Sequence, residues 1–140
     1  MVNHTEVTAE IIIHATEDKK KFFDPMYEIF EIKEEEFIQE RVEGHFGNPI
    51  LMMSIKLGKK RAEEFIKKLV SKISKSQIDE FLQNIEIYFE DSSLFIRISK
   101  KDLVRKSISL QQNDALKIKI STPVYKKSEL VKTYLKLLGQ

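Results

Sequence analysis

The sequence predicts an α+β protein in which a mixed or antiparallel sheet carries helices mainly on one face. Two segments repeat apolar residues at helical spacing, residues 59–73 and 127–138. Hairpins mixed with helices favour this class over a doubly wound parallel fold, which needs a steadier alternation of elements. Apolar and polar residues alternate, as in strands with one buried face, around positions 11–13, 87–89, 96–98 and 118–120.

The first 57 residues predict a strand, a helix and a pair of strands. Alternation over residues 5–15 predicts the first strand. A helix is expected from Thr16 to about residue 32, with Thr16 or a neighbouring carboxylate accepting from its free N–H groups. Glu17 and Asp18 would lie at the positive end of the helix dipole. Pro25 is expected to kink or break it. Strands are then expected at 36–43 and 50–57, joined by a loop over residues 44–49.

The remaining residues predict a helix-rich segment followed by further strands. The helix at 59–73 is followed by a second one at 76–84, capped by Ser76. Residues 85–98 are expected to form a hairpin that turns at 91–93. The last expected elements are a short helix at 100–105, strands at 107–111 and 115–121, and a helix at 127–138.

The composition excludes several classes of protein. The 140 residues contain no cysteine, so disulfides, thiolate metal sites and cysteine nucleophiles are absent. Only four glycines and three prolines interrupt the chain, which predicts one domain over residues 1–140. No basic leader followed by a long apolar run is present. We therefore expect a soluble, cytoplasmic protein without a membrane partner.

Charge is distributed unevenly along the chain. Residues 1–57 hold six Lys/Arg and twelve Asp/Glu, whereas residues 58–140 hold eighteen and ten. The net charge of +2 therefore combines an acidic half with a basic half. Such a division is compatible with one anion-binding face, and equally with ordinary surface charge that segregates along the chain.

Motifs for catalysis and metal binding are weak. His14 ends the first strand and His45 lies between two glycines, so these two are the candidates for a small phosphoesterase or nuclease. The sequence contains no zinc-protease motif, no phosphate-cradling glycine loop and no G-x-S-x-G serine. We expect no cofactor, no metal and no catalytic residue.

Two segments carry a family resemblance. They are His-Ala-Thr-Glu-Asp at 14–18 and Val-Glu-Gly-His-Phe-Gly-Asn-Pro-Ile at 42–50. Together they resemble an archaeal family of small predicted RNA-binding proteins, once a domain of unknown function and often described as predicted exosome subunits. The resemblance implies an α+β fold similar to ribosomal protein L5, RNA binding without established catalysis, and exosome or ribosome-related proteins as partners.

The residues that would contact RNA follow from physical chemistry rather than from the resemblance. Phosphates need Lys and Arg on one surface, and unpaired bases stack on exposed aromatic rings. Phe46, in the glycine-bracketed loop, suits stacking, although it would equally serve as a core plug. The candidates are Lys59, Lys60, Arg61, Lys67, Lys68, Arg97, Lys100, Lys101, Arg105, His45, Phe46 and Asn48.

Three functions are therefore open. The leading one is a non-catalytic RNA-binding protein, which requires a contiguous positive surface. The enzyme requires that His14, His45 and a carboxylate converge in a pocket. A protein-interaction subunit without RNA contact requires an exposed apolar patch.

Overall fold

The computed structural model describes residues 2–139, with the side chain of His45 outside the description. It has a six-stranded sheet in the order β2-β3-β1-β6-β5-β4. Every strand pair is antiparallel, so the predicted α+β class is confirmed. The elements are β1 (Glu6–His14), α1 (Lys20–Phe30), η1 (Glu34–Glu36), β2 (Ile38–Glu43), η2 (His45–Gly47), β3 (Pro49–Gly58), α2 (Lys59–Lys72), α3 (Lys75–Gln83), η3 (Ile85–Tyr88), β4 (Phe89–Glu90), β5 (Ser93–Ser99), α4 (Lys100–Val104), β6 (Ala115–Ser121), η4 (Lys127–Glu129) and α5 (Leu130–Leu137).

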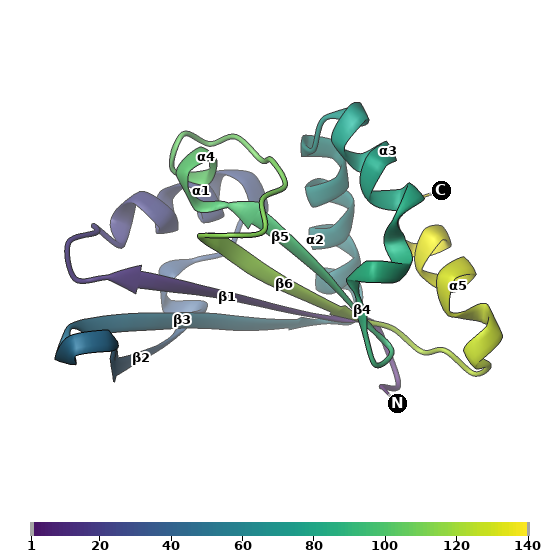
Figure 1. Ribbon diagram of the computed structural model, residues 1–140, viewed down its shortest axis with the longest axis horizontal. Helices are drawn as coiled ribbons and strands as arrows, with labels where there is room; N and C mark the ends of the chain where they lie inside the picture. Colours follow the sequence, from purple (N-terminus) through teal and green to yellow (C-terminus); the bar gives the residue numbers. More distant parts are fainter. Residues whose placement is uncertain (1, 140) are drawn as a thin grey trace.

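The helices lie on one side of the sheet, as the alternation predicts (Figure 1). In β1 every second residue from Val7 to Ile13 is buried, and the residues between them point to the opposite side. On the covered side, Ile118 of β6 lies between Ala9 of β1 and Ile96 of β5 in the register. We call the other side the open face.

Aromatic and aliphatic side chains join the helices to the covered face. Phe65 and Leu69 of α2 are buried, which confirms the inward face expected for this helix. The ring of Phe30 in α1 stacks on Phe65 with centroids 4.4 Å apart. Burying a side chain of this size contributes about 1.5–3 kcal/mol. The two helices and the sheet therefore share one core.

The start of α1 differs from the prediction. The helix begins at Lys20 rather than at Thr16, and no side chain caps it. The Asp18 carboxylate instead accepts from the backbone N–H of Lys20 at 3.0 Å. Pro25 lies inside α1 without ending it, and its side chain is buried with Phe22, Phe23 and Met26. Packing against the core thus outweighs the backbone hydrogen bond that a proline cannot make.

The expected hairpin at 85–98 is wrong in its first half. Residues Ile85–Tyr88 form the 3-10 helix η3, and strand pairing is limited to Phe89–Glu90. Tyr88 stacks on Phe81 of α3 with ring centroids 4.4 Å apart, and Ile85 is buried. These contacts hold the segment beside α3 and leave Ile87 74% exposed. Packing against the helix has overridden the alternating pattern.

Two other boundaries shift. Ser74, not Ser76, caps α3, because its side chain accepts from the Gln77 backbone N–H at 3.3 Å. The expected strand at 107–111 is reduced to one bridge between Leu110 and Ile98. No helix among residues 2–139 is long and apolar enough to cross a membrane.

The C-terminal helix is attached to the sheet through a buried phenol. The Tyr134 hydroxyl lies 2.6 Å from the Ser92 carbonyl oxygen and 3.1 Å from that of Ile120. It also accepts from the Thr122 backbone N–H at 3.2 Å. Burial raises the pKa of the Tyr134 phenol.

Replacing Tyr134 with Phe should therefore destabilise the fold. The ring would still fill its place, but buried backbone groups would lose a partner, at a cost of about 1–3 kcal/mol. Chemical denaturation would measure the change, with Tyr125→Phe as control because Tyr125 is 81% exposed. Equal stability of both variants would contradict the attachment role.

Candidate nucleic-acid interface

The end of the sheet at which β1 stops is built around Lys100. β1 pairs with β6 over Glu6–Glu10, whereas its pairing with β3 continues to His14. Lys100, the first residue of α4, reaches the edge left beside β1, and its Nζ donates to the Ile12 carbonyl oxygen at 2.6 Å. The ammonium thus satisfies a strand carbonyl at the point where the β6 pairing has ended.

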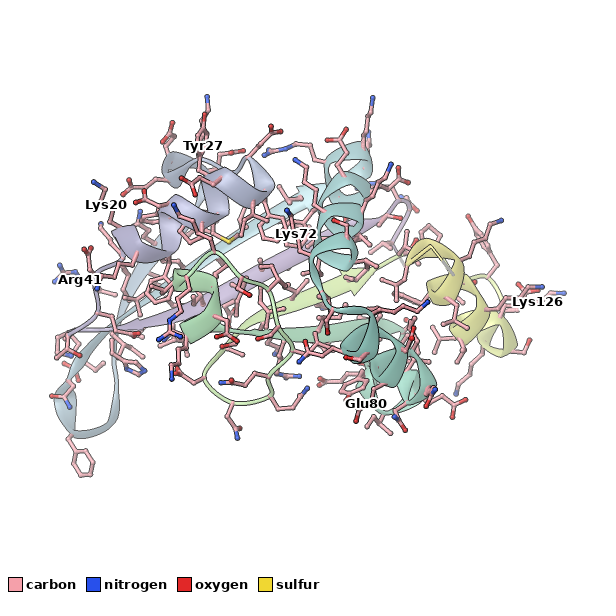
Figure 2. The ribbon with its side chains drawn as sticks, turned by 90° about the horizontal axis from the view of Figure 1, so that it is seen from above. Lys20, Tyr27, Arg41, Lys72, Glu80 and Lys126 are labelled. Carbon is pink, nitrogen blue, oxygen red and sulfur yellow. The ribbon has the colours of Figure 1, made fainter. Side chains whose placement is uncertain are left out.

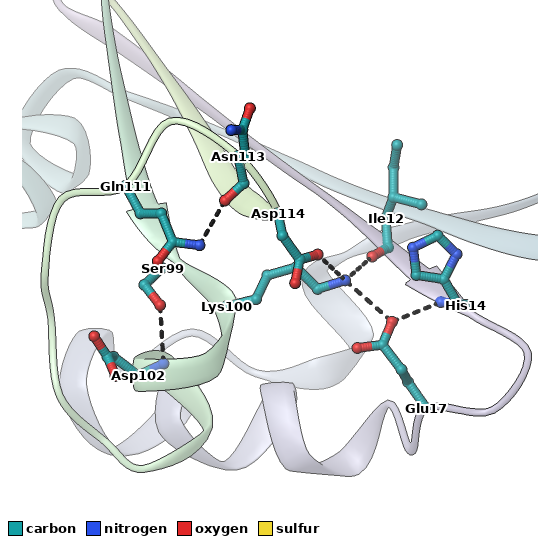
Figure 3. Close-up of polar contacts among 9 residues, drawn as sticks. All are labelled: Ile12, His14, Glu17, Ser99, Lys100, Asp102, Gln111, Asn113 and Asp114. Carbon is teal, nitrogen blue, oxygen red and sulfur yellow. Dashed lines mark hydrogen bonds and ion pairs between the residues drawn. The ribbon is translucent and has the colours of Figure 1, made fainter.

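The Lys100 ammonium is buried and compensated by two carboxylates. Its side chain is 4% exposed. Nζ lies 3.0 Å from Glu17 Oε1 and 3.4 Å from Asp114 Oδ1 (Figure 3). The Phe22 ring centroid is 5.5 Å from Nζ. A buried charge needs such partners because the interior solvates it poorly.

Glu17 connects this ion pair to the segment 14–18, the first of the two segments that carry the family resemblance. Its Oε1 accepts from the His14 backbone N–H at 2.8 Å, and its own N–H donates to the His14 carbonyl oxygen at 2.9 Å. The carboxylate therefore closes the turn after β1 and binds Lys100 at the same time. Within this segment, Glu17 serves the turn, while the neighbouring Asp18 carboxylate accepts from the first N–H of α1.

The second signature motif forms the hairpin loop between β2 and β3. Gly44 N–H donates to the Asn48 carbonyl oxygen at 2.7 Å. A Cβ on Gly44 would lie only 3.2 Å from that oxygen and from the Ile50 side chain. Gly47 has φ +72°, a conformation that favours glycine. Both glycines thus serve the geometry of a loop that leaves Phe46 99% exposed, so Phe46 is not a core plug.

Two clefts flank the turn after β1. The first, of about 430 Å³, brings the two motifs together, because His14, Ala15 and Glu17 line it with Pro49 and Ile50. Its cations are Lys19 and Arg41. Lys19, the residue before α1, donates from Nζ to the side-chain oxygen of Gln39 in β2 at 3.2 Å.

The second cleft, of about 540 Å³, lies between the turn and α4. Glu17 and Lys100 form part of its wall, with Asp18 and Asp114. Lys21, Lys101 and Arg105 also line it, and all three are exposed. We refer to the two clefts and the loop Gly44–Asn48 together as the basic end.

The structure divides the predicted RNA-contacting residues among several surfaces. Lys101 and Arg105 line the second cleft, and Phe46 and Asn48 belong to the loop beside the first. Arg97 lies on the open face of β5, while Lys100 is buried and so is not placed to meet a phosphate. The side chain of His45 lies outside the described part of the chain. The other candidates, on α2, are Lys59, Lys60, Arg61, Lys67 and Lys68.

The α2 cations lie away from the basic end, because α2 begins where β3 ends. Two of them bind carboxylates: Arg61 Nη1 lies 2.6 Å from Glu36 Oε1, and Lys68 Nζ lies 3.3 Å from Glu31 Oε2. The Arg61 hydrogen bond, helped by the Lys33 backbone N–H, lowers the pKa of the Glu36 carboxyl. Arg61 thus connects α2 to η1.

Sequence reasoning missed three cations of the basic end: Lys19, Lys21 and Arg41. Figure 2 shows Lys20, in the same Lys19–Lys21 run, and Arg41 on the same side of the molecule. The run follows directly after the first motif, so its position was a usable signal. Arg41 has no comparable signal in the sequence, because it reaches the first cleft only through the pairing of β2 with β3, which places it opposite Leu51.

The observations bear unequally on the alternative functions. His14 lines the first cleft, where its backbone makes the described hydrogen bonds. No group of three or more His, Asp or Glu side chains in the described residues could hold a metal ion. On the open face, Ile12 is 38% and Ile38 70% exposed. The two alternative functions, a small phosphoesterase or nuclease and a protein-interaction subunit without RNA contact, therefore remain predictions from the sequence.

Fold and clefts together define a small α+β protein with a single antiparallel sheet and a cation-lined end. A family model described as RNA binding matches residues 6–122, and the chain belongs to this family. The family membership expected from the two motifs is confirmed.

Similar proteins come from archaea. The RNA-binding protein PAB1135 of Pyrococcus abyssi is 29% identical over 129 residues, which cover 86% of this chain and 84% of the relative. The uncharacterized protein MJ0213 of Methanocaldococcus jannaschii is 29% identical over 108 residues, covering 72% and 70%.

Solved structures share the fold. AF2318 of Archaeoglobus fulgidus, assigned to the family DUF54, has a TM-score of 0.81 at 25% identity, with 94% of this chain and 97% of that chain covered. SSO0741 of Sulfolobus solfataricus, also assigned to DUF54, has a TM-score of 0.75 at 23% identity, with 96% and 97% covered.

The ion pair at the first motif leads to a stability prediction. Glu17→Gln keeps an oxygen for the His14 N–H but removes the charge beside Lys100, so the free energy of unfolding should fall by about 1–3 kcal/mol. Thr16→Ala should change it by less than about 0.5 kcal/mol, because Thr16 is exposed and does not cap α1. Denaturant titration of both variants measures the two losses. A larger loss of stability in Thr16→Ala than in Glu17→Gln would restore Thr16 as the cap of α1.

Proposed function

We propose that the protein is a non-catalytic RNA-binding domain, comprising residues 1–140, and that its basic end forms the main RNA contact. One observation carries the proposal: residues of both segments that carry the family resemblance, 14–18 and 42–50, line the same cleft, although α1 and η1 lie between them along the chain. Residues that a loop and a turn bring together at the end of a sheet are typical of binding sites.

The charges of the two clefts support a polyanionic ligand. The first cleft contributes Lys19 and Arg41, and the second contributes Lys21, Lys101 and Arg105. Glu17 lies in both clefts and Asp18 and Asp114 in the second, but Glu17 and Asp114 both pair with the buried Lys100. Such cations bind phosphates chiefly by releasing condensed counterions, which makes affinity dependent on salt.

The exposed loop adds a contact for a base. Phe46 is 99% exposed at a loop whose backbone is defined by the Gly44–Asn48 hydrogen bond. Bases of single-stranded RNA stack on exposed aromatic rings. Phe46, with Asn48 beside it, is therefore proposed to contact unpaired bases next to the first cleft.

Two finer expectations stay predictions. The α2 cations predicted from the sequence form a separate candidate surface. Association with the exosome or with ribosome-related RNA processing, and the likeness to ribosomal protein L5, rest on the resemblance of the two motifs. Co-purification from cell extract, followed by sequencing of bound RNA, would identify the RNA and the partners.

Charge reversal distinguishes the basic end from α2. Lys19→Glu with Arg41→Glu should weaken RNA binding and reduce the slope of log affinity against log salt by about 1.4, since each single-strand phosphate contact contributes about 0.7. The matched control is Lys59→Glu with Lys60→Glu, which changes the net charge equally at exposed positions of α2. Filter binding at several salt concentrations measures both. If only the Lys59→Glu, Lys60→Glu variant loses RNA affinity, the main RNA contact lies on α2 and not at the basic end.

Phe46→Ala should reduce RNA affinity without unfolding the protein. A stacked base contributes about 1–3 kcal/mol by alanine substitution, whereas the melting temperature should hardly change because the ring is exposed. Tyr125→Ala, at another exposed aromatic residue, is the control. If Phe46→Ala lowers stability and leaves the affinity of the folded protein unchanged, the loop has an architectural role only.

A further inference from the structure

A second cationic surface lies on the open face, over β5 and β6. Phe95 and Arg97 of β5 point to this face, because the residues that alternate with them, Leu94, Ile96 and Ile98, are buried in the core. In the register, Arg97 lies opposite Lys117 and Phe95 opposite Lys119. We refer to Arg97, Lys117 and Lys119 as the cationic strip.

The ring of Phe95 supports two cations of the strip. The Arg97 guanidinium carbon lies 5.8 Å from the ring centroid and Lys117 Nζ lies 4.9 Å from it. Phe95 is only 9% exposed, so its ring is too covered to stack on a base. Its role is to hold two long side chains in place, which reduces the entropy that they lose when they bind a ligand.

The strip continues into a hollow at each end. One hollow, of about 330 Å³, includes Arg97, Tyr88 and Gln112. The other, of about 350 Å³, includes Lys119 with the hydroxyl residues Ser93, Ser121 and Thr122. Hydroxyl groups beside a cation suit the phosphate and the 2′-hydroxyl of a ribose.

Within residues 2–139, only two of the neighbouring carboxylates lack a cation partner outside the strip. Glu10 of β1 lies opposite Lys117 in the register, and Glu90 lines the hollow beside Arg97. Glu6 lies opposite Ser121, next to Lys119, but its carboxylate is already paired with Lys56 Nζ at 3.4 Å. Lys119 has Thr8 as its neighbour on β1. The charge therefore remains positive toward β6 and favours an anionic ligand.

We propose that the cationic strip binds the phosphate backbone of a second segment of the same single-stranded RNA. The inference rests on the proposed function and extends it from the basic end to the open face. β5 continues directly into α4, which carries Lys101 and is followed by Arg105, so the chain passes from the strip to the second cleft within a few residues. Strand residues Arg97, Lys117 and Lys119 follow the RNA backbone of this second segment, while the basic end binds phosphates through its cations and bases through Phe46.

The test is a neutralised strip, with Arg97→Gln, Lys117→Gln and Lys119→Gln combined in the full chain. An oligouridine of about 20 nucleotides is long enough to cover more than one contact surface. Its affinity should fall roughly tenfold to a hundredfold, and the salt slope should decrease by about two, as for three lost phosphate contacts. A thermal melt of the variant confirms that it is folded.

The matched control neutralises three lysines beside or in α5: Lys126→Gln, Lys132→Gln and Lys136→Gln. Figure 2 places Lys126 at the far end of the molecule from Arg41. This variant loses the same net charge and should keep the affinity and most of the slope. Equal losses in both variants would overturn the proposal, because net charge alone would then explain them.

Phe95→Leu examines the support role with all three cations retained. Loss of the ring should weaken binding by roughly two- to fivefold, the equivalent of one or two cation–π contacts. Unchanged affinity and slope in the neutralised strip, with normal binding by the wild type, would refute this inference alone. A wild type that binds no oligouridine while retaining its fold would refute the strip and the proposed function together.

Discussion

The buried ammonium of Lys100 connects the parts of the chain on which the candidate interface depends. It donates to the Ile12 carbonyl oxygen of β1, and it pairs with Glu17 in the following turn and with Asp114 before β6. A lysine in an apolar interior is costly unless each of its donors has a partner. The three contacts meet this requirement and, as a consequence, determine where the turn and α4 lie.

This arrangement separates two roles that the sequence leaves mixed. Lys100 has an architectural role, whereas its neighbour Lys101 and Arg105 one turn later point into the second cleft. The same holds for the loop, where Gly44 and Gly47 serve the backbone and Phe46 is presented to solvent. The segment 42–50 therefore combines residues that define the backbone of the loop with an aromatic ring that the loop exposes.

The two faces of the sheet also differ in their physical chemistry. The side chains of the covered face, such as Val7 of β1 and Ile120 of β6, belong to the apolar core. The open face combines Ile12 and Ile38 near β2 with Arg97, Lys117 and Lys119 over β5 and β6. Since antiparallel sheets tolerate water on one side, this face is free to carry charge. The candidate RNA-binding cations accordingly occupy the basic end, the open face and α2.

The sequence by itself determined the fold class, most strands, the α2 helix and the family, because these depend on local periodicity and on two contiguous motifs. It misplaced the start of α1 and the segment Ile85–Tyr88, where the Glu17 ion pair and the stacking of Tyr88 on Phe81 override local preference. Only the tertiary structure decided which cations share a surface. Arg41 lines the same cleft as Lys19 because β2 pairs with β3, and Arg97 lies opposite Lys117 through the β5–β6 register. Neither proximity is encoded in nearby positions of the chain.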